Sequence, residues 1–271
     1  MYEQKFFKYK IEPDLFASQI GVSRWDWEFA KSSTDEETAK VIMSENKYDV
    51  LPIKENNEYK EYFATRTWNK YTSLNLYKIE DANTIYYRLT FRDLIKKFSS
   101  SLNKRYFFLT SHDDHIIGLI SLVNFNSLPV YNYLYQEIAS FEINMTEFLK
   151  KYISEEEIVL CLEKDTSDDS KNSLARYNEL YKKGNHGSIY DYLYLNSFNS
   201  IITKNIDKIP DKHRKIINIS RKIQHNFTNV RNTVMHPSKS LFIDHDSFKK
   251  VTEVLENSNA LYEFINSIED K

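Results

Sequence analysis

The chain of 271 residues is long enough for one large domain or two ordinary ones. Its 37 Lys and Arg residues nearly balance its 39 Asp and Glu residues, which argues against a general DNA-binding protein but not against an enzyme that holds a short RNA locally. The single Cys161 excludes an internal disulfide framework and a Cys-rich zinc site.

The first predicted elements are a strand and a helix. Aromatic residues alternate with smaller or charged ones over residues 25–30, which predicts a short strand. Thr34 to Glu37 has the T-x-x-E pattern of a capping box, which predicts a helix from there through about Lys47. Thr90 to Asp93 looks like a second capping box and predicts a helix through about Leu102. We call the spacing from Thr34 to Thr90 the repeat offset.

The repeat offset also relates two pairs of short apolar strands. At this offset, residues 50–53 align with residues 106–109, and residues 62–65 align with residues 118–121. Each copy then consists of a helix, a strand, a turn and a strand, with a further strand before the helix near Phe29 or Tyr86. The pattern indicates an internal duplication.

This order of elements resembles a CBS domain, and the tandem copies resemble the two-repeat CBS pair. The resemblance is carried by Y-D-V-L-P-I at 48–53 and G-L-I-S-L-V-N at 118–124, and it covers roughly residues 25–128. It implies that residues 1–128 form a CBS-pair-like regulatory α/β domain.

The resemblance also implies a ligand site. In CBS domains a Ser or Thr at the end of the last strand approaches a nucleotide phosphate, and an Asp three residues later holds the ribose hydroxyls. Here Ser121 is followed by Asn124, and Thr65 by Trp68. A neutral amide accepts two hydroxyls less well than a carboxylate. An adenine nucleotide is therefore expected at Ser121 and Asn124, with Thr65 as a weaker counterpart. The alternative is a CBS pair that serves only for dimerisation or as a scaffold.

From Pro129 onward the apolar residues follow helical spacing, through about Tyr152. Glu142 lies on the apolar side of this helix, where a carboxylate is costly to bury unless it is paired. Either Glu142 pairs with Arg231, or it is a half-exposed side chain at a subunit edge. Further helices are expected near residues 173–183, 189–204, 211–237 and 247–268. Residues 129–271 should thus form an all-α bundle, and the whole chain an α+β protein.

Residues 218–237 have an unusual helical pattern, with apolar residues on one stripe and Asn and His on the other. Pro237 should end this helix and leave His236 at its C-terminus. The stretch contains R-N-x-x-x-H, from Arg231-Asn232 to His236, which resembles the R-x4-6-H motif of HEPN domains. That resemblance implies an all-α domain, of which many are metal-independent ribonucleases that act as dimers. The alternative is an ordinary surface helix end with Arg231 in a salt bridge.

The motif residues suit RNA cleavage by attack of the 2′-OH on the adjacent phosphate. His236 has the pKa range for a general acid or base, and the guanidinium of Arg231 suits a phosphorane. Asn232 could orient the imidazole or hold a phosphate oxygen. The basic residues between Lys204 and Lys222 either hold phosphates or form a solvated helix face.

Two functions are therefore predicted. The first is a ligand-regulated, metal-independent RNA endonuclease that acts as a homodimer, with RNA as substrate and an adenine nucleotide as regulatory ligand. The second is a non-catalytic nucleotide sensor whose HEPN-like bundle serves dimerisation or partner binding, so the sequence leaves open whether the chain is an enzyme. The longest apolar run, residues 116–123, is far shorter than the roughly 20 residues that span a bilayer. The N-terminal residues lack a signal-peptide core, and a cytoplasmic protein without membrane contact is expected.

Overall fold

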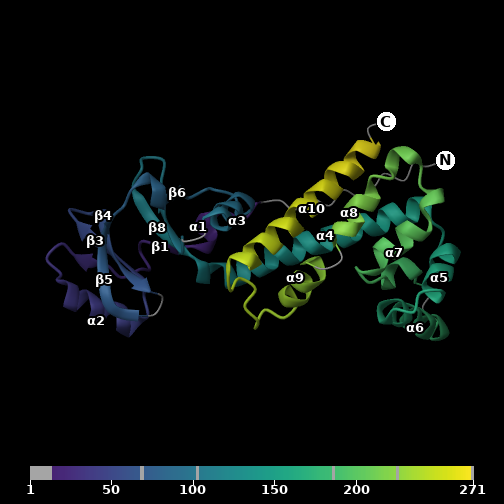
Figure 1. Cartoon of the computed structure of the whole chain (residues 1–271), viewed down its shortest axis with the longest axis horizontal. Coiled ribbons are helices and arrows are strands. Elements are labelled where there is room, and N and C mark those ends of the chain that lie inside the picture. The colour runs from purple at the N-terminus through teal and green to yellow at the C-terminus, as the bar shows by residue number, and fades with distance from the viewer. Residues whose placement is uncertain (1–13, 68–69, 102–103, 185–186, 224–225, 270–271) are drawn as a thin grey trace. The chain divides into compact units, whose positions relative to one another are not determined.

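The computed structural model describes residues 14–67, 70–101, 104–184, 187–223 and 226–269. The chain divides into two compact units, which we call the N-terminal unit (residues 14–130) and the helical unit (residues 131–271, as far as described). Figure 1 shows the strands in the first and the long helices α4 and α10 in the second. Each unit is described by itself.

The N-terminal unit contains two four-stranded sheets, with strand orders β1-β8-β7-β6 and β2-β3-β4-β5. The strands are β1 (Val22–Ser23), β2 (Ala30–Lys31), β3 (Val50–Glu55), β4 (Glu58–Thr67), β5 (Lys70–Lys78), β6 (Thr84–Tyr86), β7 (Tyr106–Thr110) and β8 (Ile116–Ser121). The helices are α1 (Ala17–Ile20), α2 (Glu36–Asn46) and α3 (Phe91–Ser100), with 3-10 turns η1 (Asp81–Asn83) and η2 (Leu122–Asn126).

The predicted duplication is present in the topology. In one sheet β2 is parallel to β3 and β3 antiparallel to β4, and in the other β6 is parallel to β7 and β7 antiparallel to β8. The strands β3 and β7 begin at Val50 and Tyr106, which are separated by the repeat offset, as predicted. Each sheet is completed by a different segment, because β5 pairs with β4 whereas β1 pairs with β8.

The last strands of the two copies do not keep this offset. Val50 lies opposite Ala64, whereas Tyr106 lies opposite Ser121. The amide of Thr65 donates to the carbonyl of Asp49 over 3.1 Å, and that of Leu122 to the carbonyl of Arg105 over 3.0 Å. The structural counterpart of Ser121 is therefore Ala64, and the sequence alignment of Thr65 with Ser121 is displaced by one residue. A displacement of one residue matters, since neighbouring side chains of a strand point to opposite faces.

Two local predictions need correction. Residues 25–29 form no strand; they are a turn and loop between β1 and β2. Trp25 stays 81% exposed while Trp27 packs edge-on against Tyr59, so the alternation of aromatic residues reflects individual contacts rather than a pleated strand. The N-cap of α2 is Asp35, not Thr34, because Asp35 Oδ1 accepts the amide of Thr38 over 2.7 Å.

Aromatic residues join the two repeats. Tyr59, Tyr62 and Ala64 of β4 form one buried cluster with Phe108 of β7 and Ile116 of β8. Tyr62 and Phe108 have ring centroids 4.9 Å apart. This cluster fixes the faces of the two repeats that border the cavity described below.

The helical unit contains α4 (Leu128–Tyr152), α5 (Glu155–Glu163), α6 (Asp168–Lys182), α7 (Ser197–Lys204), α8 (Ile216–Ile223), α9 (Asn226–Val234) and α10 (His245–Glu269). Shorter 3-10 turns are η3 (Ile189–Tyr192), η4 (Ile206–Lys208) and η5 (Asp211–His213). The helix expected over residues 129–152 is confirmed. The helix expected over residues 211–237 is divided into η5, α8 and α9, and residues 224–225 lie outside the described residues.

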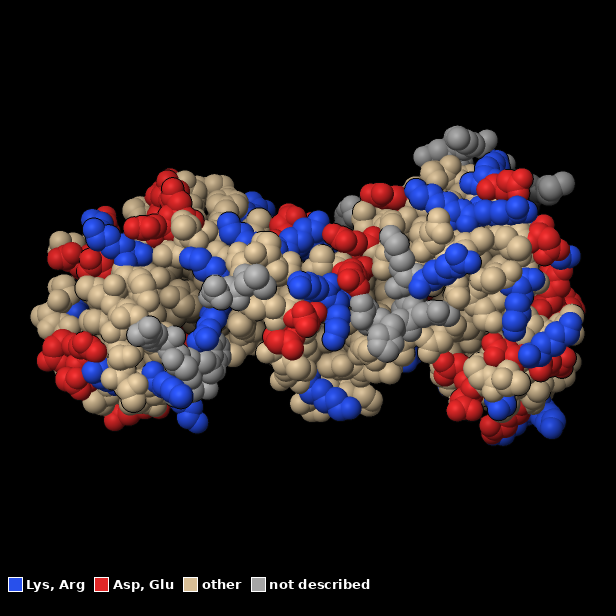
Figure 2. Space-filling model, viewed as in Figure 1, with Lys and Arg blue, Asp and Glu red and all other residues tan. Residues whose placement is uncertain are grey.

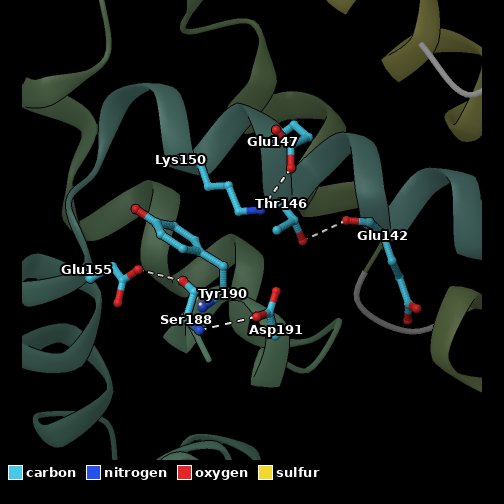
Figure 3. A network of polar contacts seen from close by, with 8 residues as sticks. All are labelled: Glu142, Thr146, Glu147, Lys150, Glu155, Ser188, Tyr190 and Asp191. Carbon is cyan, nitrogen blue, oxygen red and sulfur yellow. Dashed lines mark hydrogen bonds and ion pairs between the residues drawn. The ribbon is translucent and has the colours of Figure 1, made fainter. Parts of the chain in front are cut away.

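The long helix α4 is the centre of this unit. Its buried face packs Phe141 against Phe227 of α9 and Phe148 against Phe264 of α10, with ring centroids 4.5 and 6.0 Å apart. On another face, Lys150 pairs with Glu147 over 2.9 Å and lies 5.8 Å from the ring centre of Tyr190 in η3 (Figure 3). Helix α4 therefore fixes both α9, which carries the Arg231 motif, and η3.

Candidate functional site

A cavity of about 460 Å³ opens between the two repeats of the N-terminal unit. It is lined by segments that the duplication relates: the start of β3 in the first copy and the start of β7 in the second, together with the end of β8. The lining residues are Val22, Asp26, Trp27, Glu28, Asn46, Lys47, Tyr48, Asp49, Val50, Pro52, Arg105, Tyr106, Leu119, Ser121, Val123 and Asn124. The volume lies within the range of roughly 300–1,000 Å³ that is usual for small-molecule sites.

Two aromatic side chains that line the cavity, Trp27 and Tyr106, are held in place by hydrogen bonds to other tyrosines. The indole Nε1 of Trp27 donates to the hydroxyl of Tyr59 over 3.3 Å, and the two rings meet edge-on at 5.0 Å. The hydroxyl of Tyr106 donates to that of Tyr62 over 3.3 Å, and burial raises the pKa of Tyr106, which therefore stays neutral. Rings held in this way offer a preformed flat surface to a planar ligand.

Ser121 and Asn124, both predicted as ligand-binding residues, line this cavity. Their polar atoms are bound to each other: Asn124 Oδ1 accepts the amide of Ser121 over 2.7 Å and its hydroxyl over 2.9 Å. The bond from the amide is the capping-box contact at the start of η2, and the bond from the hydroxyl joins the two side chains. The acceptor expected to hold a ribose and the donor expected to hold a phosphate are thus both engaged in the local turn.

Thr65 is not among the residues that line the cavity. Its hydroxyl donates to Asp49 Oδ1 over 3.0 Å, and Asp49 is a lining residue. Trp68, the residue at the expected Asp position of the first copy, lies outside the described residues. Thr65 therefore bonds a lining residue and does not line the cavity itself.

Several lining residues were missed from the sequence, above all Trp27, Asp49 and Arg105. A signal for two of them existed, because Asp49 and Arg105 are related by the repeat offset and each precedes a predicted strand. Residues at the same place in two repeats come together where the repeats face each other. Trp27 gave no such signal, because the residue at the repeat offset from it is Asn83.

The second candidate region is the Arg231 motif in the helical unit. Nε of Arg231 in α9 donates to Oε1 of Glu142 in α4 over 3.2 Å, which confirms the partner proposed from the sequence. Burial raises the pKa of the Glu142 carboxyl, and the nearby Arg231 guanidinium acts in the opposite direction. The two side chains remain 30% and 33% exposed. Figure 3 shows the carboxylate of Glu142 extending away from Thr146, whose hydroxyl bonds the Glu142 main chain.

The other motif residues are exposed. Asn232 lies on the open side of α9, and His236 lies beyond the end of the helix at Val234. The amide of His236 donates to the carbonyl of Thr233 over 3.0 Å, which tightens the chain into a turn before Pro237. The sequence predicts a helix that continues to His236, and the observed helix ends two residues earlier, at Val234. Within the described ranges, no hydrogen bond joins the side chains of Arg231 and His236.

Three of the basic residues before the motif are ion-paired. Lys208 bonds Glu157 over 2.9 Å, Arg214 bonds Asp211 over 2.7 Å, and Lys204 lies 3.8 Å from Asp165. Figure 2 shows Lys and Arg interspersed with Asp and Glu over most of the visible face, with a run of Lys and Arg at the upper right. At these three positions the contacts favour a solvated helix face over a dedicated phosphate-binding surface.

Metal clusters and membrane spans are both absent from the described residues. No group of three or more His, Cys, Asp or Glu side chains is placed to hold a metal ion there. No helix in the described ranges combines the length and the apolar character needed to cross a bilayer.

No protein-family model matches the chain, and no curated protein matches it. A hemolysin-like protein containing a CBS domain, from Oenococcus oeni PSU, is a similar solved structure at 14% identity and a TM-score of 0.32, over 41% of this chain and 87% of that one. A CBS domain-containing protein of unknown function from Bacillus anthracis str. Ames Ancestor is similar at 9% identity and a TM-score of 0.33, over 44% and 92%. Both structures are CBS-domain proteins, but TM-scores this low assign no function to this chain.

Proposed function

We propose that the chain is a regulatory protein whose N-terminal unit senses a small adenine-containing ligand in the cavity between its repeats. The observation that carries this proposal is the cavity itself, with its two fixed aromatic walls at Trp27 and Tyr106. Adenine as the ligand class is suggested by the resemblance of residues 48–53 and 118–124 to CBS repeats. A planar base would pack on these rings, and polar side chains at the rim would meet its sugar.

Isothermal titration calorimetry on the full chain tests this proposal. The ligands are adenosine, AMP, ADP and ATP, with cytidine and CMP as non-purine controls. We expect saturable binding of at least one adenine compound, and its loss by at least about tenfold in Trp27→Ala, because the substitution removes one aromatic wall. Trp25→Ala is the matched control, since Trp25 is two residues away, 81% exposed and not part of the lining. Absence of binding by all four adenine compounds contradicts the proposal.

A second candidate function is metal-independent RNA cleavage by the helical unit as a homodimer. The observation that favours it is the Glu142–Arg231 pair, which holds a partly exposed guanidinium beside the exposed Asn232, with the exposed His236 in the turn that follows the helix. In this proposal Arg231 stabilises the phosphorane, His236 transfers protons and Asn232 positions the imidazole or a phosphate oxygen. RNA is the substrate, no metal takes part, and a second copy of the chain supplies the other half of the site.

Cleavage of a labelled RNA in EDTA tests this second candidate. We expect cyclic-phosphate ends from the wild type, and loss of at least about a hundredfold in rate for His236→Ala and for Arg231→Ala. Arg176→Ala and His112→Ala are controls, because Arg176 is exposed on α6, outside the basic stretch, and His112 pairs with Tyr86 in the N-terminal unit. Cleavage that survives His236→Ala comes from a contaminant or another site and contradicts the assignment. Sedimentation of the same samples shows whether the chain is a dimer.

A further inference from the structure

The charges that line the cavity are unfavourable for a polyphosphate. Three lining residues carry carboxylates, Asp26, Glu28 and Asp49, and two carry cations, Lys47 and Arg105. The lining therefore has one net negative charge. A nucleoside adds none, whereas each phosphate of a nucleotide adds at least one more negative charge against this background.

At Ser121 the cavity also lacks the free donors for a phosphate that its sequence suggests. The hydroxyl and amide protons of Ser121 both point at Asn124 Oδ1, over 2.9 and 2.7 Å. A phosphate oxygen is only an acceptor, and it would have to displace Asn124 and open the cap of η2 to obtain either proton. Binding a phosphate at Ser121 thus costs an existing pair of hydrogen bonds.

Two of the lining carboxylates are suited to binding the hydroxyls of a sugar. Asp26 and Glu28 are exposed, line the cavity and are the chain neighbours of Trp27, and both are acceptors for a ribose diol. Glu28 is oriented by Asn46, whose Nδ2 donates to Glu28 Oε2 over 3.3 Å. Two carboxylates that line the same cavity as a fixed ring place sugar-binding acceptors near a base-binding surface.

We propose that the cavity selects an uncharged nucleoside, bound through its base and ribose, and discriminates against nucleoside polyphosphates. Asp26 and Glu28 are the specificity-determining residues of this selection. The inference rests on the proposed ligand-sensing function of the cavity, and it names the charge class of the ligand.

The test compares adenosine, AMP and ATP by calorimetry on the full chain, in low salt without Mg²⁺. We expect affinity to fall in that order, with ATP at least about tenfold weaker than adenosine. The ratio should shrink at about 0.5 M salt, because ions screen the repulsion. In the double variant Asp26→Asn, Glu28→Gln the ratio should also shrink, since two negative charges are removed. Glu55→Gln, an exposed carboxylate of the same unit outside the lining, should leave the ratio unchanged.

The outcomes separate this inference from the function on which it rests. ATP that binds as tightly as adenosine, or more tightly, overturns the charge selection and leaves ligand sensing in place. A ratio that does not change in the double variant also overturns it, because the discrimination then has another source. If neither adenosine nor any nucleotide binds, the ligand-sensing function itself is wrong.

Discussion

Arg231 and Glu142 are 89 residues apart in the sequence, and a hydrogen bond of 3.2 Å between Nε and Oε1 joins them across α9 and α4. Burial of Glu142 opposes its ionisation, while the guanidinium favours it. The contact ties the helix that carries the R-N-x-x-x-H motif to the central helix of its unit. Whatever the motif does, the position of Arg231 depends on Glu142.

Removing the carboxylate should weaken the helical unit modestly. Glu142→Ala removes the acceptor of the Arg231 hydrogen bond and is expected to lower the free energy of unfolding by about 1 kcal/mol, a value kept small because both side chains are about one third exposed and solvent screens the pair. Urea denaturation followed by circular dichroism measures the change. Glu179→Ala on α6, in a pair with Lys183 whose side chains are both 64% exposed, should change stability less. A loss no larger than that of the control shows that the pair contributes nothing.

The same carboxyl predicts a pH dependence. Burial raises the folded-state pKa of Glu142 above its usual value of 4.5, so the folded protein keeps this proton to higher pH than the unfolded chain. The stability that the raised pKa adds is therefore fully present below pH 4.5 and is lost as the pH rises through the raised folded value, whereas the hydrogen bond to Arg231 is a separate contribution. Urea midpoints of the wild type relative to Glu142→Gln should fall over this window. A difference that is flat, or that rises with pH, contradicts the assignment.

Asn124 should stabilise the end of the second repeat. Asn124→Ala removes the acceptor for both bonds from Ser121 and should lower the free energy of unfolding by about 1 kcal/mol, as for other helix caps. The substitution is followed by thermal denaturation, with Asn132→Ala on the exposed side of α4 as the control. Equal melting temperatures for the two variants show that the cap is energetically unimportant.

Gly118 allows β1 and β8 to approach closely. A Cβ at this position would lie 2.6 Å from the carbonyl oxygen of Val22, which is backbone and cannot rotate away. Gly118→Ala should therefore destabilise the N-terminal unit by about 1–3 kcal/mol through steric overlap. Denaturant unfolding measures the loss, and Ser100→Ala at the exposed end of α3 should be nearly neutral. An unchanged midpoint for Gly118→Ala means that the two strands separate without cost.

The repeat architecture could be predicted because its signals are local. Thr90 caps α3 through the amide of Asp93, as the capping pattern indicates, and β3 and β7 begin at the expected residues. The exact register of a hairpin cannot be predicted from local signals in the same way, because it depends on how the two strands pair across the turn. The alignment of Thr65 with Ser121 was therefore displaced by one residue, and with it the counterpart of a predicted site residue.

The cavity could be predicted only in part. Ser121 and Asn124 follow from the resemblance, but Trp27, Asp49 and Arg105 reach the cavity because the two repeats pack face to face. The mutual bonds of Ser121 and Asn124 could not be read from their spacing either. In the helical unit, the Glu142–Arg231 contact was predicted because a carboxylate on an apolar helix face needs a partner, while the exact end of α9 depended on the turn before Pro237.

Hydrogen–deuterium exchange with saturating adenosine tests the central claim most directly, because it reports where a ligand acts as well as whether it binds. We predict slower exchange in residues 46–50, 104–106 and 119–124, the segments that line the cavity, and loss of that protection in Trp27→Ala but not in Trp25→Ala. Unchanged exchange in these three segments, or protection confined to residues elsewhere in the chain, would contradict the assignment of the cavity as the ligand site.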